Sequence, residues 1–188
     1  MKRFSVAVAF LAAATLSATT SSAQSSKAVS IGISGGAAIP VGGLADDYTT
    51  GYNGTASLML KSFGSPIGLR IDGSYNHMAV KNDRTIIIPG SGIANAVAIS
   101  TANANLVFNL PGTGMTPYLI GGAGVYNMKI DVEDADDPDS FNKFGLNGGI
   151  GASFPLSGFN AFIEARYHHV FTDNQATQFV PVTFGLSF

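Results

Sequence analysis

The stretch Gln178-Phe-Val-Pro-Val-Thr-Phe-Gly-Leu-Ser-Phe188 alternates between apolar residues and small or polar ones up to its last position. Because alternate side chains of a β-strand project from opposite faces, one face of this stretch carries only apolar side chains. They are Val180, Val182, Phe184, Leu186 and Phe188. An apolar row of this length needs apolar surroundings, which the hydrocarbon of a membrane provides. The stretch therefore predicts a strand of a transmembrane β-barrel.

The composition favours a barrel over a helical membrane protein or a soluble domain. Hydrophobic residues make up 46% of the chain and charged residues 12%, against roughly 25% charged residues in soluble proteins. Beyond the N-terminal segment there is no apolar run of the roughly 18 residues that a spanning helix needs. The net charge is −2 and the Lys and Arg residues beyond the N-terminus are scattered, which argues against nucleic acid as a partner. The chain has no cysteine, so it forms no disulfide.

The N-terminus has the features of a secretory signal peptide. Lys2 and Arg3 precede a short apolar core at 6–16, and Ser21-Ser-Ala23 supplies the small residues that a cleavage site requires. The core is too short to anchor the chain across a bilayer. We therefore expect a signal peptide at 1–23 and a single β-barrel domain at 24–188.

Eight segments of the chain alternate as strands with one apolar face do. In the segment that ends at Leu110, Leu106 and Phe108 alternate with Asn103 and Asn105. No segment of similar length has a sustained repeat of 3.6 residues, so helices are not predicted. The eight segments lie near 28–39, 52–62, 66–77, up to 110, and near 117–130, 144–154, 159–171 and 178–188.

The connections between these segments alternate in length. The short ones, rich in glycine and proline, are expected at 63–65, 111–116 and 155–158. The longer ones, mostly more polar, are expected at 40–51, 78–91, 131–143 and 172–177. Short turns at one end and long loops at the other are typical of an up-and-down membrane barrel. The predicted fold is therefore all-β, an eight-stranded antiparallel up-and-down transmembrane β-barrel.

With these features the sequence resembles the small outer-membrane β-barrel family that includes the OmpA transmembrane domain and OmpX. The resemblance rests on the signal peptide, the eight strands, the loop alternation, the first-hairpin segment at 36–54 and the terminal strand. It implies a non-enzymatic protein of the bacterial outer membrane without cofactors, active in envelope integrity or in surface adhesion. The implied partners are outer-membrane lipid, lipopolysaccharide, an extracellular ligand of the external loops, and the barrel-assembly machinery during biogenesis. The resemblance also implies that Phe184, Leu186 and Phe188 belong to the assembly signal.

If the apolar faces meet lipid, the polar faces line the lumen. The strands near 66–77 and 159–171 are four apart in a closed barrel of eight, so they lie opposite each other. The first carries Arg70 and Asp72 inward and the second carries Glu164 and Arg166, four charges whose sum is zero. Because the interior of an eight-stranded barrel is just wide enough for side chains to fill, these charges are expected to pair across it. Further expected members of this network are Lys61, Asn103, Asn105 and His168.

Aromatic residues predict two belts at the membrane interfaces. The strand near 117–130 is expected to point Tyr118, Ile120, Tyr126, Met128 and Ile130 toward lipid. One belt is then formed by Tyr75, Tyr126 and Tyr167, and the other by Phe108, Tyr118, Phe154, Phe159 and Phe188.

One external loop contains six carboxylates, at Asp131, Glu133, Asp134, Asp136, Asp137 and Asp139. Clustered carboxylates can bind a divalent cation weakly, alone or bridging lipopolysaccharide phosphates. The loop lacks the glycine and the terminal glutamate of an EF-hand, which favours a solvated acidic loop over a metal site.

Three other functions have to be weighed against a closed, non-enzymatic barrel. A small-solute channel, with the charges as a gated ion path, is disfavoured by an interior filled with charged and amide side chains. A lipid A deacylase needs a serine two residues after its histidine, and Val170 and Phe171 follow His168 and His169 at that distance. A lipocalin-like carrier would need an apolar lumen and a polar outside, the reverse of the predicted pattern.

Overall fold

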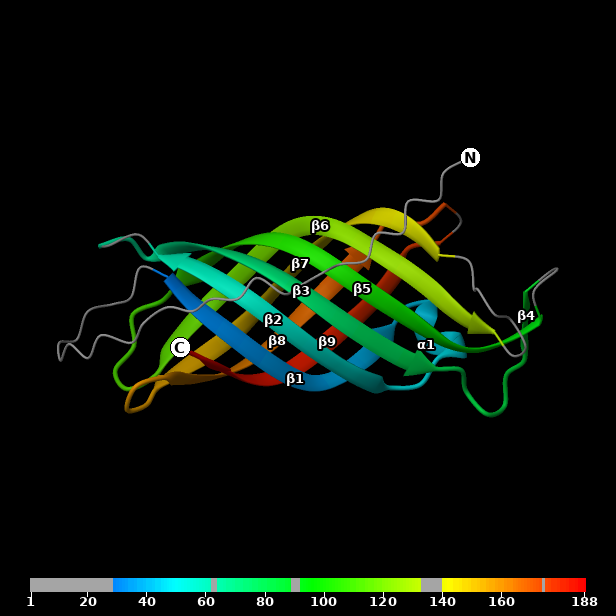
Figure 1. Ribbon diagram of the computed structural model, residues 1–188, viewed down its shortest axis with the longest axis horizontal. Coiled ribbons are helices and arrows are strands. Elements are labelled where there is room, and N and C mark those ends of the chain that lie inside the picture. Colours follow the sequence, from blue (N-terminus) through cyan, green and yellow to red (C-terminus); the bar gives the residue numbers. More distant parts are fainter. Residues whose placement is uncertain (1–28, 62–63, 89–91, 133–139, 174) are drawn as a thin grey trace, which may run out of the picture.

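The computed structural model is a closed barrel (Figure 1), and it describes residues 29–61, 64–88, 92–132, 140–173 and 175–188. The predicted signal peptide lies outside the described residues and remains a prediction. Among the residues that are described, no helix is long and apolar enough to cross a membrane.

The barrel wall consists of eight antiparallel strands, each paired with its neighbours in sequence. Closure comes from two pairings, β1 with β9 and β3 with β5, which leave the short β4 outside the ring. The strands are β1 (Val29–Val41), β2 (Gly51–Lys61), β3 (Ile67–Ala79), β4 (Ile86–Ile88), β5 (Gly92–Asn109), β6 (Thr116–Val132), β7 (Ser140–Pro155), β8 (Asn160–Val170) and β9 (Thr177–Ser187). The predicted eight-stranded up-and-down barrel is confirmed.

The connections separate to the two ends of the barrel, as expected. Those at 62–66, 110–115 and 156–159 join strands at one end, where the C-terminus also lies (Figure 1). We call this the short-turn end and the opposite one the long-loop end. The long-loop end has structure that the sequence did not predict, a short helix α1 (Leu44–Asp47) and strand β4.

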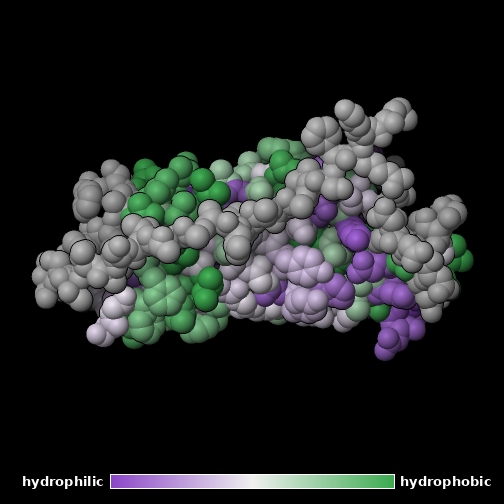
Figure 2. Space-filling view, viewed as in Figure 1, coloured by the Kyte–Doolittle hydropathy of each residue, from purple (hydrophilic) through white to green (hydrophobic). Residues whose placement is uncertain are grey.

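The outer surface of the wall carries the predicted apolar rows. Large apolar side chains of β1, β3, β5 and β9 are exposed, among them Ile33, Ile71, Leu106 and Phe184. In Figure 2 hydrophobic residues gather toward the short-turn end of the visible face, and hydrophilic ones toward the long-loop end. The residues that alternate with these apolar side chains along the same strands, such as Asp72, Asn105 and Thr183, are buried inside the barrel. The outward and inward faces are therefore as predicted for these strands.

The predicted orientation of β6 is wrong. Tyr118 and Tyr126 are 6% and 0% exposed and point inward, whereas Leu119 and Val125 are 48% and 52% exposed. Along 117–126 both faces of β6 carry apolar or small residues, while the polar Asn127 and Lys129 lie on the outward face nearer the long-loop end, so polarity favoured the wrong orientation. The lumen needs bulky side chains beside the glycines of β7, and the two tyrosines supply that bulk together with a hydroxyl group.

The aromatic belts change accordingly. Tyr75 and Tyr167 are exposed on the outer surface, as are Phe108, Phe154 and Phe188, while Phe159 is half-buried. Tyr118 and Tyr126 belong to neither belt, because their rings fill the lumen.

The interior is layered rather than polar throughout. At the long-loop end an apolar cluster fills the lumen, formed by Ala38, Tyr48, Met78, Val97, Ile99, Tyr126, Met128, Val170 and Phe179. Leu44 of α1 packs against this cluster from the connection between β1 and β2. The charged residues lie on the short-turn side of it, so the expectation of a wholly polar lumen is corrected.

Candidate functional site: the closed interior

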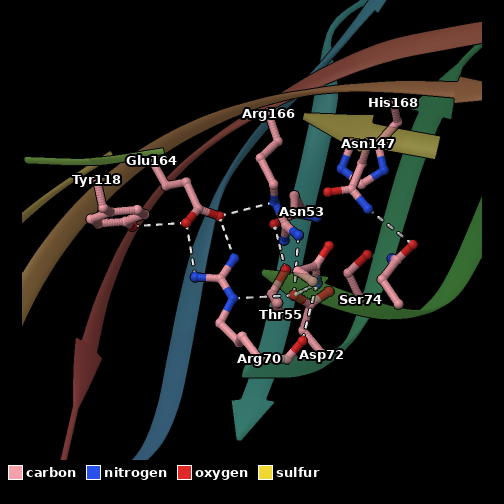
Figure 3. Close-up of polar contacts among 12 residues, drawn as sticks. Asn53, Thr55, Arg70, Asp72, Ser74, Tyr118, Asn147, Glu164, Arg166 and His168 are labelled. Carbon is pink, nitrogen blue, oxygen red and sulfur yellow. Dashed lines mark hydrogen bonds and ion pairs between the residues drawn. The ribbon is translucent and has the colours of Figure 1, made fainter. Parts of the chain in front are cut away.

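Four charged side chains from opposite walls meet in the middle of the lumen (Figure 3). Arg70 of β3 donates from Nη1 and Nη2 to the two carboxylate oxygens of Glu164 on β8, at 2.8 and 2.7 Å. Its Nε donates to Oδ2 of Asp72 at 3.2 Å. Arg166 completes the ring, with Nη1 3.0 Å from Asp72 Oδ2 and Nε 2.9 Å from Glu164 Oε1. All four side chains are at most 7% exposed.

The register explains why these residues meet. Arg70 and Asp72 are two apart on β3, and Glu164 and Arg166 two apart on β8, so each pair shares the inward face of its strand. The two strands are opposite in the ring of eight, so the bidentate pair of Arg70 and Glu164 crosses the lumen. Two positive and two negative charges satisfy one another, which lowers the cost of burying them. The network joins β3 to β8 through side chains alone.

Glycines on β7 make room for a side chain that extends this network. Tyr118 of β6 donates its hydroxyl to Glu164 Oε2 at 2.8 Å, although β7 lies between the two strands. It passes over Gly151, the cross-strand partner of both Tyr118 and Glu164. A Cβ at Gly151 would lie 2.2 Å from Cζ of Tyr118, so only glycine fits beneath this ring.

A second tyrosine of β6 lies over another glycine of β7, nearer the long-loop end. Tyr126 lies over Gly145, where a Cβ would be 2.7 Å from its ring, and its hydroxyl is 2.8 Å from Nδ1 of His168. His168 stacks on Phe179 with ring centroids 4.8 Å apart. The structure therefore places His168 at the boundary with the apolar cluster, away from the ion pairs that were expected to include it.

Amide and hydroxyl groups form the rest of the polar layer. Asn105 donates to Asp72 Oδ2 at 2.8 Å, and Asn147 donates to Asn103 at 3.3 Å. Below the ion pairs, at the short-turn end, a small pocket of about 60 Å³ remains, with room for only a few water molecules. Arg70 and Tyr118 form its inner wall. The lumen thus has a small pocket at the short-turn end, and buried side chains occupy it from the ion pairs to the apolar cluster.

Sequence reasoning found the four charges but missed Tyr118, Tyr126 and Asn147. A signal existed in the inward glycines of β7, because glycine beside an aromatic residue on the next strand often marks a ring lying over the backbone. The pairing register needed to use that signal is not visible in the sequence.

The remaining predicted site residues are only partly described. The side chain of Lys61 and the residues 133–139, which hold most of the acidic loop, lie outside the described part of the chain. Asp131 is described, and its Oδ2 is 3.8 Å from Nε2 of His77. Within the described ranges, no three His, Asp or Glu side chains gather as metal ligands would. Cation binding by the loop remains a prediction.

The two adjacent histidines have separate environments. His168 points inward to Tyr126, and Nε2 of Gln178 donates to Nδ1 of His169 at 3.2 Å on the outer side of the wall. The described hydrogen-bond partner of His168 is thus a tyrosine and that of His169 a glutamine. A deacylase of the kind considered above would pair its histidine with a serine nucleophile.

A family profile decides what kind of barrel this is. The family described as outer membrane protein beta-barrel domain matches residues 7–188, almost the whole chain. The chain belongs to this family. It is therefore a protein of the bacterial outer membrane, and its apolar outer rows face lipid. No curated protein matches this sequence.

Solved structures of similar fold are small outer-membrane barrels. Neisserial surface protein A aligns with a TM-score of 0.64 at 12% identity, over 85% of this chain and 96% of its own. A major outer membrane protein of Thermus thermophilus aligns with a TM-score of 0.53 at 13% identity, over 86% and 98%. Ail of Yersinia pestis, crystallised with the heparin analogue sucrose octasulfate, is 20% identical with a TM-score of 0.47, over 85% and 96%. At these identities the likeness concerns the fold alone.

Proposed function

We propose that this family member is a non-enzymatic barrel with a closed interior, which acts in envelope integrity or surface adhesion through its long-loop end. The observation that carries the proposal is the bidentate pair of Arg70 and Glu164 across the lumen. Together with the apolar cluster above it, this pair leaves no room for solutes to pass. The surface available for partners is then the outer wall and the loops.

The proposed orientation puts the short-turn end in the periplasm and the long-loop end outside the cell, as is general for such barrels. The outward rows then contact outer-membrane lipid, with lipopolysaccharide around the long-loop end.

Complementation tests this function. A strain without the protein receives the wild type, or a barrel whose connections at 80–91 and 171–176 are cut to tight turns. We expect the wild type to restore resistance to detergent and attachment to matrix-coated surfaces, and the shortened barrel to fold without restoring either. Full restoration by the shortened barrel would show that the loops are not needed.

We also propose that the terminal strand is read by the assembly machinery through Phe184, Leu186 and Phe188. Phe188 is half-exposed toward lipid, and its backbone pairs with Ile31 of β1, so this residue lies at the seam that closes the barrel.

Replacing Phe188 with Asp should lower the amount of folded protein in the outer membrane several-fold, because a charge replaces the terminal apolar contact. Heat-modifiable gel migration of membrane fractions measures the folded amount. Leu156→Asp, in a turn at the same end, is the matched control and should assemble normally. Normal membrane levels of Phe188→Asp would rule out this role.

A further inference from the structure

A small pocket lies on the axis of the barrel at the short-turn end. Its volume is about 60 Å³, and each of the eight wall strands contributes a residue to its lining. Arg70 and Tyr118 form its inner wall. Four serines stand around it on four different strands, Ser30 on β1, Ser57 on β2, Ser153 on β7 and Ser187 on β9. The pocket thus presents hydrogen-bonding groups on several sides.

The charge that faces this pocket is positive. Arg70 is the one charged residue among the described residues that line it. Its Nε and one N–H of each Nη donate to Asp72 and Glu164 (Figure 3), and neither carboxylate lines the pocket. A guanidinium carries five N–H groups, so one N–H on each Nη can donate to a further acceptor. The Arg70 side chain is 7% exposed, so such an acceptor reaches it through the pocket.

Apolar side chains form another part of the lining. Met59, Val107 and Phe162 border the pocket together with the serines. Guanidinium and hydroxyl groups both donate to a carboxylate, and bonds between charged partners are about twice as strong as neutral ones. The apolar side chains can contact the carbon atoms next to the carboxylate, a contact that phosphate or chloride cannot make. The lining therefore fits a carboxylate on a short apolar group better than an inorganic anion.

The size of the pocket restricts the ligand further. One water molecule needs about 10–15 Å³ of such a cavity, so about 60 Å³ holds about four or five non-hydrogen atoms. Gly32 keeps this space free, because a Cβ there would lie 2.5 Å from Oγ of Ser57 and 3.8 Å from the ring of Phe162. Acetate has the required size, as has the terminal carboxylate of a peptide with the carbon atoms next to it.

We propose that this pocket binds a small carboxylate, with its oxygens toward Arg70 and the serine hydroxyls and its carbon end toward Phe162. The carboxylate belongs to a free short-chain acid or to the C-terminus of a peptide on the short-turn side of the membrane. The proposal goes beyond the proposed function, because it concerns the short-turn end and not the loops. The interior stays closed when the site is occupied, since the ion pairs and the apolar cluster lie beyond it.

The test is a titration of the isotope-labelled protein in nanodiscs with sodium acetate, followed by the NMR shifts of its amides. Sodium chloride at the same ionic strength is the reference. We expect saturable shifts at Ser57, Ser153 and Ser187, with a dissociation constant in the millimolar range. Acetamide has the same shape without the charge and should bind about tenfold more weakly or less. N-acetylalanine separates the two sources, because it binds at least as tightly as acetate if the pocket takes a peptide C-terminus and more weakly if it takes a free acid.

Two glycines of β1 provide matched variants. Gly32→Ala places a methyl group in the pocket and should weaken acetate binding by about tenfold or more. Gly35→Ala, on the outward face of the same strand, has no heavy atom nearer than 3.5 Å to its Cβ and should bind as the wild type does. Ser57→Ala removes one hydroxyl without filling the pocket and should weaken binding several-fold, which keeps the test valid if Gly32→Ala does not fold.

Several results would overturn the proposal. Shifts that do not saturate, or that chloride reproduces, would mean an adventitious ion only. Acetamide binding as tightly as acetate would show that Arg70 does not recognise the charge. Equal binding by folded Gly32→Ala and Gly35→Ala, or by Ser57→Ala and the wild type, would place the ligand elsewhere. Complementation and conductance do not depend on this pocket, so failure of carboxylate binding leaves the proposed function standing.

Discussion

Arg70→Met should destabilise the barrel by about 3–5 kcal/mol, the usual cost of breaking a buried ion pair by removing one partner. Glu164 would lose two hydrogen bonds of 2.7 and 2.8 Å, and Asp72 would lose one of 3.2 Å. Two buried carboxylates would then share Arg166 as the remaining cation of the ring. Urea unfolding in lipid vesicles, followed by far-UV circular dichroism and gel mobility, measures the change.

The double variant Arg70→Met with Glu164→Gln is the matched control, since it removes one charge of each sign. Asp72 and Arg166 remain paired at 3.0 Å, so the double variant should be more stable than the single one. If the free energy of unfolding of Arg70→Met lies within about 0.5 kcal/mol of the wild-type value, as for a surface substitution, the ion network does not hold the barrel together.

Gly151→Val should cost about 3 kcal/mol or more, because its side chain would occupy the place of the Tyr118 ring. The ring would have to leave, and the hydrogen bond of its hydroxyl to Glu164 would be lost with it. The folded fraction on heat-modifiable gels, and the urea midpoint of what folds, report the effect.

Gly148→Val is the control on the same strand. Gly148 faces outward, and a Cβ there would have no heavy atom nearer than 3.9 Å. We expect the free energy of unfolding of this variant to lie within about 1 kcal/mol of the wild-type value, because valine is well suited to a lipid-facing strand position. The stability of Tyr118→Phe should lie between those of Gly151→Val and Gly148→Val, since this variant keeps the ring and loses only the hydroxyl group. Equal stability of Gly151→Val and Gly148→Val would contradict the described packing of Tyr118.

The fold followed from the sequence wherever one face of a strand was apolar and the other polar. The alternation of Leu106 and Phe108 with Asn103 and Asn105 allowed only one orientation of β5. In β6 the polar Asn127 and Lys129 lie on the outward face and Tyr118 and Tyr126 on the inward one, so polarity favoured the wrong orientation. Polarity predicts orientation in a narrow barrel only where the lumen is polar, and here it is also filled by tyrosine, methionine and isoleucine side chains.

The ion pairs were accessible to prediction because strand count alone puts β3 opposite β8. The hydrogen bond of Tyr118 to this network could not be predicted, since it depends on which glycine of β7 lies beside Tyr118. β4 was assigned to a loop because three isoleucines are too short a run to show alternation. Local pattern thus predicts the strands, while register decides which side chains meet inside.

The central claim, that the interior is closed, is tested most directly by conductance of the purified protein in a planar lipid bilayer. A general porin in the same bilayer serves as the positive control. The contacts of Arg70, Glu164 and Tyr118, with the apolar cluster above them, predict no sustained openings. Sustained openings on the nanosiemens scale would contradict a closed interior.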